Sequence, residues 1–384
     1  MTGMILTEEE RMLQNLVRDF ADRELIPRAR EVDEKEEFSW ENWKGMAQLG
    51  LTGIGIDVKY GGSGGGYRQV AIAAEETARG DASASVTLIA HLSLGTATIY
   101  RFGNEEQRQR LIPSLASGKG IAAWALTEPS GGSDAASLRT AATKREGTYF
   151  LTGTKTFITN ANEAESIVVF ATQDPSQGYK GISAFVVPRD APGLQVNPLH
   201  GKMGMRGSRT NEMVFQDTPV PADNLLGEEG RGFRYAMDIL DSSRIIIAAQ
   251  CVGIGQAALE AAVRYAQQRE AFGRPIAQHQ AILFMLADMA AEVYAARVAT
   301  MNAATLKDND LPFVNEGSMA KLIASEMCVR VASQAVQVHG GYGYFKDAAV
   351  ERIFRDSRVT TIYEGTSEVQ RMVIGKQVLA QYPV

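Results

Sequence analysis

The feature that most constrains the fold is a series of long helical patterns in the C-terminal part of the chain. Apolar residues recur at helical spacing over roughly 233–269, 279–306, 314–339, 349–355 and 367–380. These stretches carry Ala, Ile, Val and Met on more than one face. Helices of this kind bury those faces against each other and often against another subunit. The sequence therefore predicts a helical bundle here.

The N-terminal part also has helical patterns. Thr7 precedes Glu10 by three residues, the spacing of a capping box, and we expect the helix that follows to end near Pro27. A glycine-rich stretch at 61–66 precedes an Ala-rich helical run at 67–78. A phosphate-binding loop would need a Lys-Ser/Thr ending, which is missing here, so we interpret the glycines as a flexible connector.

The middle of the chain has a different texture. Short β-branched and aromatic runs, separated by Gly, Asn, Asp and Pro, occur at 149–151, 166–172, 182–187 and 212–215. Since no helical pattern lies between them, they predict a small antiparallel β domain or barrel. The chain is then mainly α with a central β domain, divided into an all-α part at 1–120, a β part at 121–232 and a helical bundle at 233–384.

Composition excludes several classes of protein. With 39 Lys and Arg against 45 Asp and Glu, the net charge is -6, and no basic excess points to nucleic acid. Cys251 and Cys328 both lie in apolar stretches, which favours buried thiols over a disulfide or a metal site. The sequence shows no signal peptide and no apolar run of membrane-spanning length. We therefore expect a cytoplasmic, prokaryotic protein with no membrane span.

Six motifs carry more specific information. The first, 124–134, is rich in small residues that expose backbone N–H groups and hydroxyls, although such a run alone equally fits a plain turn. It resembles the Thr-Glu-Pro-x-x-Gly-Ser-Asp signature of the acyl-CoA dehydrogenase family. The other five resemble motifs of the same family, appear in the family's order and span nearly the whole chain: 157–160, 241–244, 269–273 with Gln280, 337–341 and 363–368.

The resemblance implies a fold and a cofactor. The fold would be an N-terminal helical domain, a small β-barrel domain and a C-terminal four-helix bundle, and the cofactor would be FAD. The residues implied at the flavin ring are Trp124, Leu126, Thr127, Ser133, Phe157, Ile158 and Thr159. A neighbouring subunit would reach the FAD through Arg269, Phe272, Gln280, Gln337, Gly340 and Gly341, while Thr366 and Glu368 would contact the adenosine part.

Each of these residues also has a plainer interpretation when taken singly. Arg269 could be a solvated helix-end charge, Phe272 a core residue, and Gly340 with Gly341 a helix C-cap. Asp241 and Arg244 are spaced for a routine i, i+3 ion pair on a helix. The resemblance instead implies that Ser133, Asp241, Arg244, Tyr363 and Gly365 bind the acyl-CoA substrate.

Glu364 is the predicted catalytic base. It follows a β-branched stretch at 359–363 that suggests an extended strand, and it precedes Thr366 or Ser367, either of which could cap the last helix. A loop glutamate alone is usually solvated and inert. The resemblance implies that this carboxylate removes the α-proton of a thioester while FAD accepts the β-hydride. Once substrate is bound, we expect burial to raise its pKa more than the helix N-terminus lowers it.

Some family members carry the base on an earlier helix, immediately before the arginine. In this chain that position is Ser243, so the base stays at Glu364. Phe157 stands where many members have Trp, and Trp124 where many have Tyr or Phe, so the packing around the ring is aromatic but altered. Short, branched and alicyclic acyl groups are all open, because the sequence does not show how the apolar helix residues of the pocket floor are oriented. The resemblance implies a homotetramer, a dimer of dimers, that passes electrons to an electron-transferring flavoprotein. An acyl-CoA oxidase using O₂ and a non-catalytic helical scaffold are the alternatives.

Overall fold

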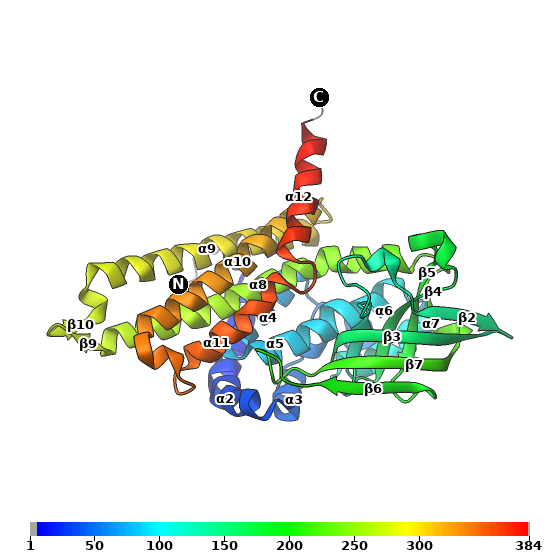
Figure 1. The fold of residues 1–384 in the computed structure, drawn as a ribbon, viewed down its shortest axis with the longest axis horizontal. Coiled ribbons are helices and arrows are strands. Elements are labelled where there is room, and N and C mark those ends of the chain that lie inside the picture. The colour runs from blue at the N-terminus through cyan, green and yellow to red at the C-terminus, as the bar shows by residue number, and fades with distance from the viewer. Residues whose placement is uncertain (1–5, 383–384) are drawn as a thin grey trace.

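A computed structural model describes residues 6–382 of the protein. Helices from both ends of the sequence pack together, and a β-sheet lies at one end of the elongated molecule (Figure 1). The N-terminal helices are α1 (Glu8–Phe20), the π-helical turn η1 (Ala21–Leu25), α2 (Ile26–Lys35), α3 (Trp40–Gln48), α4 (Tyr67–Gly80), α5 (Ala82–Ile89), the π-helical segment η4 (Ala90–Thr96), α6 (Ala97–Phe102) and α7 (Glu105–Ala116).

The first helix begins as predicted and ends later than predicted. Thr7 Oγ1 accepts from the Glu10 N–H at 3.2 Å and Glu10 Oε2 accepts from the Thr7 N–H at 3.0 Å, so the capping box is confirmed. The predicted end near Pro27 is wrong, because helical structure continues through η1 and α2 to Lys35. The π-helical turn changes the hydrogen-bond register just before Pro27. This places the proline in the first turn of α2, where its missing N–H costs little.

The glycine-rich stretch leads into the N-terminus of α4, which a carboxylate from a distant helix caps. Asp308, at the end of α9, accepts from the Tyr67 N–H at 2.6 Å and from the Arg68 N–H at 3.0 Å. A Cβ added at Gly66 would lie 2.4 Å from Asp308 Oδ1, so only glycine allows this close approach. The stretch therefore connects to α4, and a carboxylate of the protein itself caps that helix.

The central strands form one sheet with the order β6-β7-β3-β2-β4-β5-β8. Most neighbours are antiparallel, as expected, but β1 runs parallel to β4 and β2 meets β4 in one parallel bridge, so the sheet is mixed. The predicted runs at 166–172 and 182–187 correspond to β4 and β5. The strands are β1 (Ala122–Ala125), β2 (Ala141–Arg145), β3 (Thr148–Thr159), β4 (Ser166–Thr172), β5 (Ile182–Pro188), β6 (Leu194–Leu199), β7 (Thr210–Pro221) and β8 (Leu225–Leu226).

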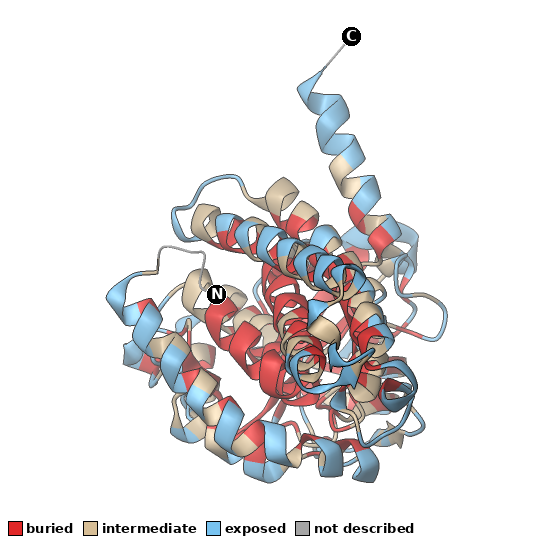
Figure 2. Ribbon diagram, turned by 90° about the vertical axis from the view of Figure 1, so that its left-hand side faces the viewer, coloured by how far each residue is buried: buried red, intermediate tan, exposed pale blue. Residues whose placement is uncertain are grey.

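The C-terminal part is helical, as predicted. Its elements are α8 (Gly232–Gln268), the short hairpin β9 (Glu270–Ala271) and β10 (Arg274–Pro275), α9 (Gln280–Asp308), α10 (Val314–His339), α11 (Ala349–Ser357), the 3₁₀ turn η10 (Arg358–Thr361) and α12 (Ser367–Gln381). Helices α8, α9 and α10 pack on one another, and α12 touches α10 and then projects away from the body of the chain (Figure 1). Most of α12 is exposed (Figure 2).

One hydrophobic core joins the two ends of the sequence. Ala71 of α4, Ile247 of α8, Val293 of α9 and Met327 of α10 belong to the same buried cluster. The division at residues 120 and 232 stays a prediction, since the N-terminal and C-terminal helices share this core. Cys251 and Cys328 are buried free thiols within it, as expected.

Two helical stretches contradict the expectation that no apolar run reaches membrane-spanning length. Ala82–Phe102 and Gly232–Gln268 are long and apolar enough, by composition alone, to cross a membrane. Their most apolar windows are 94% and 78% buried inside the protein, respectively. Both are therefore core helices of this fold, whose apolar character is used to pack against other helices.

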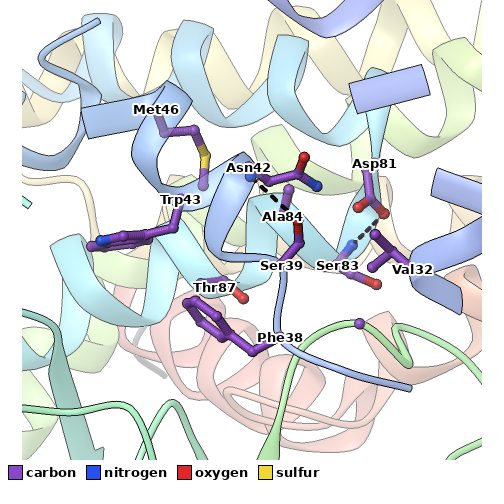
Figure 3. A pocket seen from close by; sticks show the side chains of 11 residues that line it. Val32, Phe38, Ser39, Asn42, Trp43, Met46, Asp81, Ser83, Ala84 and Thr87 are labelled. Atoms are coloured by element: carbon purple, nitrogen blue, oxygen red, sulfur yellow. Dashed lines mark hydrogen bonds between the residues drawn. The ribbon is translucent and has the colours of Figure 1, made fainter. Parts of the chain in front are cut away.

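A small cavity lies between α2, α3 and α5, lined by residues that include Phe38, Asn42, Asp81 and Thr87 (Figure 3). Its volume is about 10 Å³, room for about one water molecule. The side-chain amide of Asn42 is buried there without a hydrogen-bond partner among the described residues. A cavity of this size is too small for an organic ligand.

Candidate active site

Glu364 lies on the turn between η10 and α12. The preceding residues were expected to be extended, and that expectation is wrong, because 358–361 form a 3₁₀ turn. Local hydrogen bonds explain the difference: Thr360 Oγ1 donates to the Ser357 carbonyl at 2.7 Å, and the Ile362 N–H donates to the Val359 carbonyl at 2.9 Å. Such local bonds outweigh the β-branched composition. Thr366 caps α12 by accepting from the Val369 N–H at 3.2 Å, as predicted.

The backbone around Glu364 is unusual. Its φ is 49°, in the left-handed region that side chains other than glycine rarely adopt, and Gly365 follows with φ 93°. A Cβ at Gly365 would lie 2.5 Å from Gln370 Nε2. Such conformations cost roughly 1–3 kcal/mol and persist where the surrounding structure over-determines them. The direction of the Glu364 side chain is therefore fixed by its surroundings.

Helix α8 supplies the side chains that hold this turn. The fully buried Ser243 donates from Oγ to Glu364 Oε2 at 2.5 Å. Tyr363 donates from its hydroxyl to Gln250, also on α8. Arg244, six residues before Gln250 on the same helix, pairs with Asp241 at 2.6 Å, so the predicted i, i+3 ion pair is confirmed. The Nε of Arg244 is buried without a hydrogen-bond partner among the described residues, and it can bind a further polar group.

The environment of Glu364 sets its proton affinity. Burial raises the pKa of this carboxyl to about 7, although the Ser243 hydrogen bond and the charges of Lys321 and Arg244 oppose the rise. A carboxyl with this pKa is partly ionised at neutral pH. It can therefore accept a proton and later release it, as a general base must.

This raised pKa predicts a pH-dependent difference in stability. Between its ordinary pKa of 4.5 and about 7, Glu364 binds more protons in the folded than in the unfolded protein, so its contribution to stability falls as pH rises through that window. The free energy of unfolding of a Glu364→Gln variant, relative to that of the wild type, should therefore be higher at pH 8 than at pH 4.5 by up to about 3 kcal/mol. Urea unfolding of both proteins at the two pH values measures the gain. A difference that stays constant with pH would contradict it.

A second group of predicted residues lies in the β domain. The Thr156 N–H donates to the Thr127 carbonyl at 2.9 Å and joins the two segments predicted at the flavin ring. Beneath them, the buried Lys155 donates to the Leu126 carbonyl at 3.0 Å and pairs with Glu128 at 2.7 Å. The structure therefore brings 124–133 and 157–159 together.

The surface of these segments suits a flat ring with a polar edge. Phe157 is 68% exposed at an irregularity of β3, with φ 59°, so a large apolar ring is held outward in a strained conformation. Leu126 and Ile158 are buried, Thr127 and Thr159 are partly buried, and Ser133 is exposed. These residues offer three hydroxyls beside an uncovered aromatic ring, which fits an isoalloxazine ring.

Helix α6 connects this region to α8. Trp124 is partly buried, and its Nε1 donates to Thr98 Oγ1 at 3.1 Å. Three residues on, Arg101 pairs with Asp238 at 2.8 Å and approaches Ser242 Oγ at 3.4 Å, next to the serine that binds Glu364. Trp124 also packs on the same hydrophobic cluster as the first turns of α8. The Trp124 segment and the Glu364 turn thus share one supporting helix.

The third group of predicted residues lies far away. Arg269 is the C-cap of α8 and lies 26 positions after Ser243, a distance of about 39 Å at 1.5 Å per residue. Arg269 stacks over Tyr342 at 5.6 Å, so the hairpin after α8 meets the end of α10. Phe272 is 95% exposed, which excludes the core interpretation, and Gly340 is the C-cap of α10. Other exposed members are Gln280, Gln337 and Gly341.

A helical protein with an inserted β domain, a carboxyl of raised pKa and an exposed aromatic ring has the features that the sequence motifs implied for a flavin-dependent oxidoreductase. Family models agree: "Acyl-CoA dehydrogenase, N-terminal domain" matches residues 7–119, the "middle domain" matches 123–218 and the "C-terminal domain" matches 230–379. The chain belongs to the acyl-CoA dehydrogenase family. It is therefore an FAD-dependent enzyme that dehydrogenates acyl-CoA.

Individual proteins show how close the match is. The chain is 49% identical over 376 residues to an acyl-CoA dehydrogenase of Bacillus subtilis (strain 168), covering 98% of this chain and 99% of that protein. The solved butyryl-CoA dehydrogenase from Megasphaera elsdenii has a TM-score of 0.96 at 43% identity, covering 98% and 99% of the two chains. A structure described as "Electron transferring flavoprotein of Acidaminococcus fermentans: Towards a mechanism of flavin-based electron bifurcation" has a TM-score of 0.96 at 42% identity, with the same coverage.

Sequence reasoning missed several residues that support this site. Lys321 and Lys155 are fully buried, and Gln250 and Glu128 are buried partners of site segments. One signal was present for Lys321, a single charge within the apolar run of 319–324. Charged side chains are rarely buried unless they have a specific role, so this position could have been marked.

Proposed function

We propose that this chain removes the α-proton of a short-chain acyl-CoA with Glu364. The observation that carries the proposal is the Glu364 carboxyl itself, whose pKa burial raises to about 7 and whose Oε2 is held by Ser243. With one oxygen fixed, the other is left to receive the proton. When bound, FAD supplies the acceptor for the β-hydride.

The chain also has groups to bind the thioester. Within the described residues, no hydrogen bond uses the N–H of Glu364, so this group is available to the thioester carbonyl, where negative charge develops. Asp241, Arg244, Tyr363, Gly365 and Ser133 are the proposed substrate contacts. The unpartnered Nε of buried Arg244 supports its part in this set.

The proposed FAD contacts of one chain come from the β domain and from the start of α12. Thr127, Ser133 and Thr159 would bind the polar edge of the flavin, and the side chains of Trp124 and Phe157 would pack near its rings. Leu126 and Ile158 would support them from below. Thr366 and Glu368, at the start of α12, would contact the adenosine part.

Short acyl groups are proposed because a relative of 43% identity is a butyryl-CoA dehydrogenase. Anaerobic bleaching of the flavin by butyryl-, isobutyryl-, octanoyl- and cyclohexanecarboxyl-CoA tests this. We expect the second-order rate constant of flavin reduction by butyryl-CoA to exceed that by octanoyl-CoA by at least about tenfold, on the scale of 1–3 kcal/mol by which a pocket discriminates added methylenes. Equal or faster bleaching by octanoyl-CoA would contradict the short-chain assignment.

The proposed electron acceptor is an electron-transferring flavoprotein, since a similar solved chain comes from work on such a flavoprotein. The alternative, an acyl-CoA oxidase, passes the electrons to O₂. Rapid release of peroxide when acyl-CoA is added in air would favour the oxidase. Reduction of a purified electron-transferring flavoprotein, with little peroxide, would favour the dehydrogenase.

We further propose that a neighbouring copy completes each FAD site within a homotetramer. The roughly 39 Å between Ser243 and Arg269 along one helix prevents both groups from serving one site in a single chain. Exposed apolar residues on projecting elements support self-association, including Phe272, Leu283 and Phe284 near the hairpin and Met372 and Leu379 on α12.

Mixed assemblies test the shared site. Glu364→Gln and Arg269→Ala chains, each inactive alone at limiting FAD, are co-expressed with different tags and the hybrids are purified. If sites are shared, pairing the two variants creates one site with both Glu364 and Arg269 intact, and activity returns. Hybrids that remain inactive would show that each chain builds its site alone.

A further inference from the structure

Lys321 is a buried cation directly behind the Glu364 turn. It lies on α10 and is fully buried. Its Nζ donates to the Thr360 carbonyl at 2.8 Å and to the Gly365 carbonyl at 2.8 Å. These two carbonyls flank the turn that carries Glu364, so a single ammonium group binds both ends of the turn.

Lys321 has no ion-pair partner within 4.0 Å among residues 6–382. Burial lowers the pKa of its ammonium, the expected effect of removing a charge from water. A buried, unpaired charge is costly, and two carbonyl acceptors compensate for only part of that cost. This cost indicates that Lys321 has a role other than stabilising the fold.

The charges around the turn show what the ammonium acts on. From α8 the groups facing this region are Asp241, Arg244 and Cys251, and Asp241 is paired with Arg244. From α10 they are Glu326 and Cys328, from α11 Asp356, and from the turn itself Tyr363 and Glu364. Glu326 is partly exposed and pairs with Arg371 at 3.4 Å. Within the described part of the chain Asp356 also lacks an ion pair and accepts from the Met205 N–H at 2.5 Å, but the carboxylate charge that acts most strongly on Lys321 is that of Glu364.

We propose that Lys321 is a positioning residue for Glu364. Its ammonium group holds both ends of the Glu364 turn, and its buried positive charge favours the ionised carboxylate. The proposal rests on the proposed function of Glu364 as the base. Lys321 does not touch the substrate in this scheme. It acts by holding the strained backbone at Glu364 and Gly365 and by limiting how far burial raises the carboxyl pKa.

Two substitutions separate the clamp from the charge. Lys321→Met removes both, whereas Lys321→Gln removes the charge but keeps two N–H donors for the carbonyls of Thr360 and Gly365. Ser325→Ala, one turn further along α10, is the matched control, because the Ser325 hydroxyl bonds only to the Leu322 carbonyl of its own helix. Each variant is purified with FAD, and kcat for butyryl-CoA is measured from pH 5.5 to pH 9.5.

In both Lys321 variants the acidic limb of the kcat profile should move up by about one pH unit, the lower end of the shift expected from one nearby charge. Lys321→Met should also lose kcat at every pH, Lys321→Gln should recover most of its kcat at high pH, and Ser325→Ala should leave the profile unchanged. An acidic limb that does not move in a folded Lys321→Gln protein, or failure of both variants to fold, would reduce Lys321 to a structural role and overturn the proposal.

An infrared titration separates this proposal from the function on which it rests. The carboxyl stretching band of Glu364, identified as the band that Glu364→Gln removes, should titrate at higher pH in Lys321→Gln than in the wild type. This infrared titration can be carried out without catalytic turnover. If Glu364→Gln kept near-normal activity, the proposed function would fail while the band still moved. A band that does not move would overturn the role of Lys321 alone.

Discussion

Replacing Glu364 by Gln is expected to lower kcat by about two to four orders of magnitude, the contribution of a positioned general base. Gln has the same shape and can still accept the hydrogen bond from Ser243, so the turn keeps its contacts. It cannot accept the α-proton. Stopped-flow bleaching of the flavin by butyryl-CoA under anaerobic conditions measures the step directly, and FAD content and ligand affinity should stay close to those of the wild type.

A matched control keeps the carboxylate and removes only its partner. In Ser243→Ala the base remains, and its pKa should rise because the hydrogen bond that favours the ionised form is lost. Its bleaching rate should therefore recover as pH increases, whereas the rate of Glu364→Gln should stay low at every pH. Near-normal bleaching by Glu364→Gln would mean that another group takes the proton.

The long helices and the buried strands were the part of the fold that sequence could predict. The pattern at 314–339 corresponds to α10, which buries a regularly spaced apolar face, and that at 166–172 corresponds to β4, a short apolar strand whose seven residues are all buried. Prediction failed where local hydrogen bonds decide the conformation. A π-helical turn carries the chain past Pro27, and a hydroxyl bond from Thr360 converts a β-branched stretch into a 3₁₀ turn.

The candidate site was predictable as a set of positions but not as an arrangement. The family motifs pointed to Glu364 and to Arg269 alike, and the motifs do not show that α8 holds them far apart. The single charge within 319–324 marks Lys321 as a candidate for burial, but the sequence does not show its proposed partner, because Glu364 is 43 residues away. Which group a buried charge faces depends on tertiary packing, which no local pattern contains.

The largest expected change in stability is at Lys155, next to the segments proposed to face the flavin. Its side chain is 0% exposed and pairs at 2.7 Å with Glu128, whose side chain is 4% exposed. Glu128 also accepts from the Arg139 and Thr140 N–H groups at 2.6 and 2.9 Å. Burial lowers the pKa of Lys155 to about 8, so at pH 7 both members of the pair are still charged. The pair ties β3 to the loop that carries Thr127 and Ser133.

Lys155→Met should therefore destabilise the protein by about 3–5 kcal/mol, because Glu128 is left as a buried carboxylate without its cation. Adding Glu128→Gln should restore much of the loss, since the uncompensated charge is then gone. Lys144→Met is the matched control on β2: the Lys144–Glu229 pair has a similar distance of 2.8 Å but side chains that are 51% and 47% exposed, so solvent screens the pair and its loss should change stability little. Urea unfolding at pH 7 with the same excess of FAD compares the three variants. Equal losses in Lys155→Met and Lys144→Met would show that burial of the Glu128–Lys155 pair does not stabilise this loop.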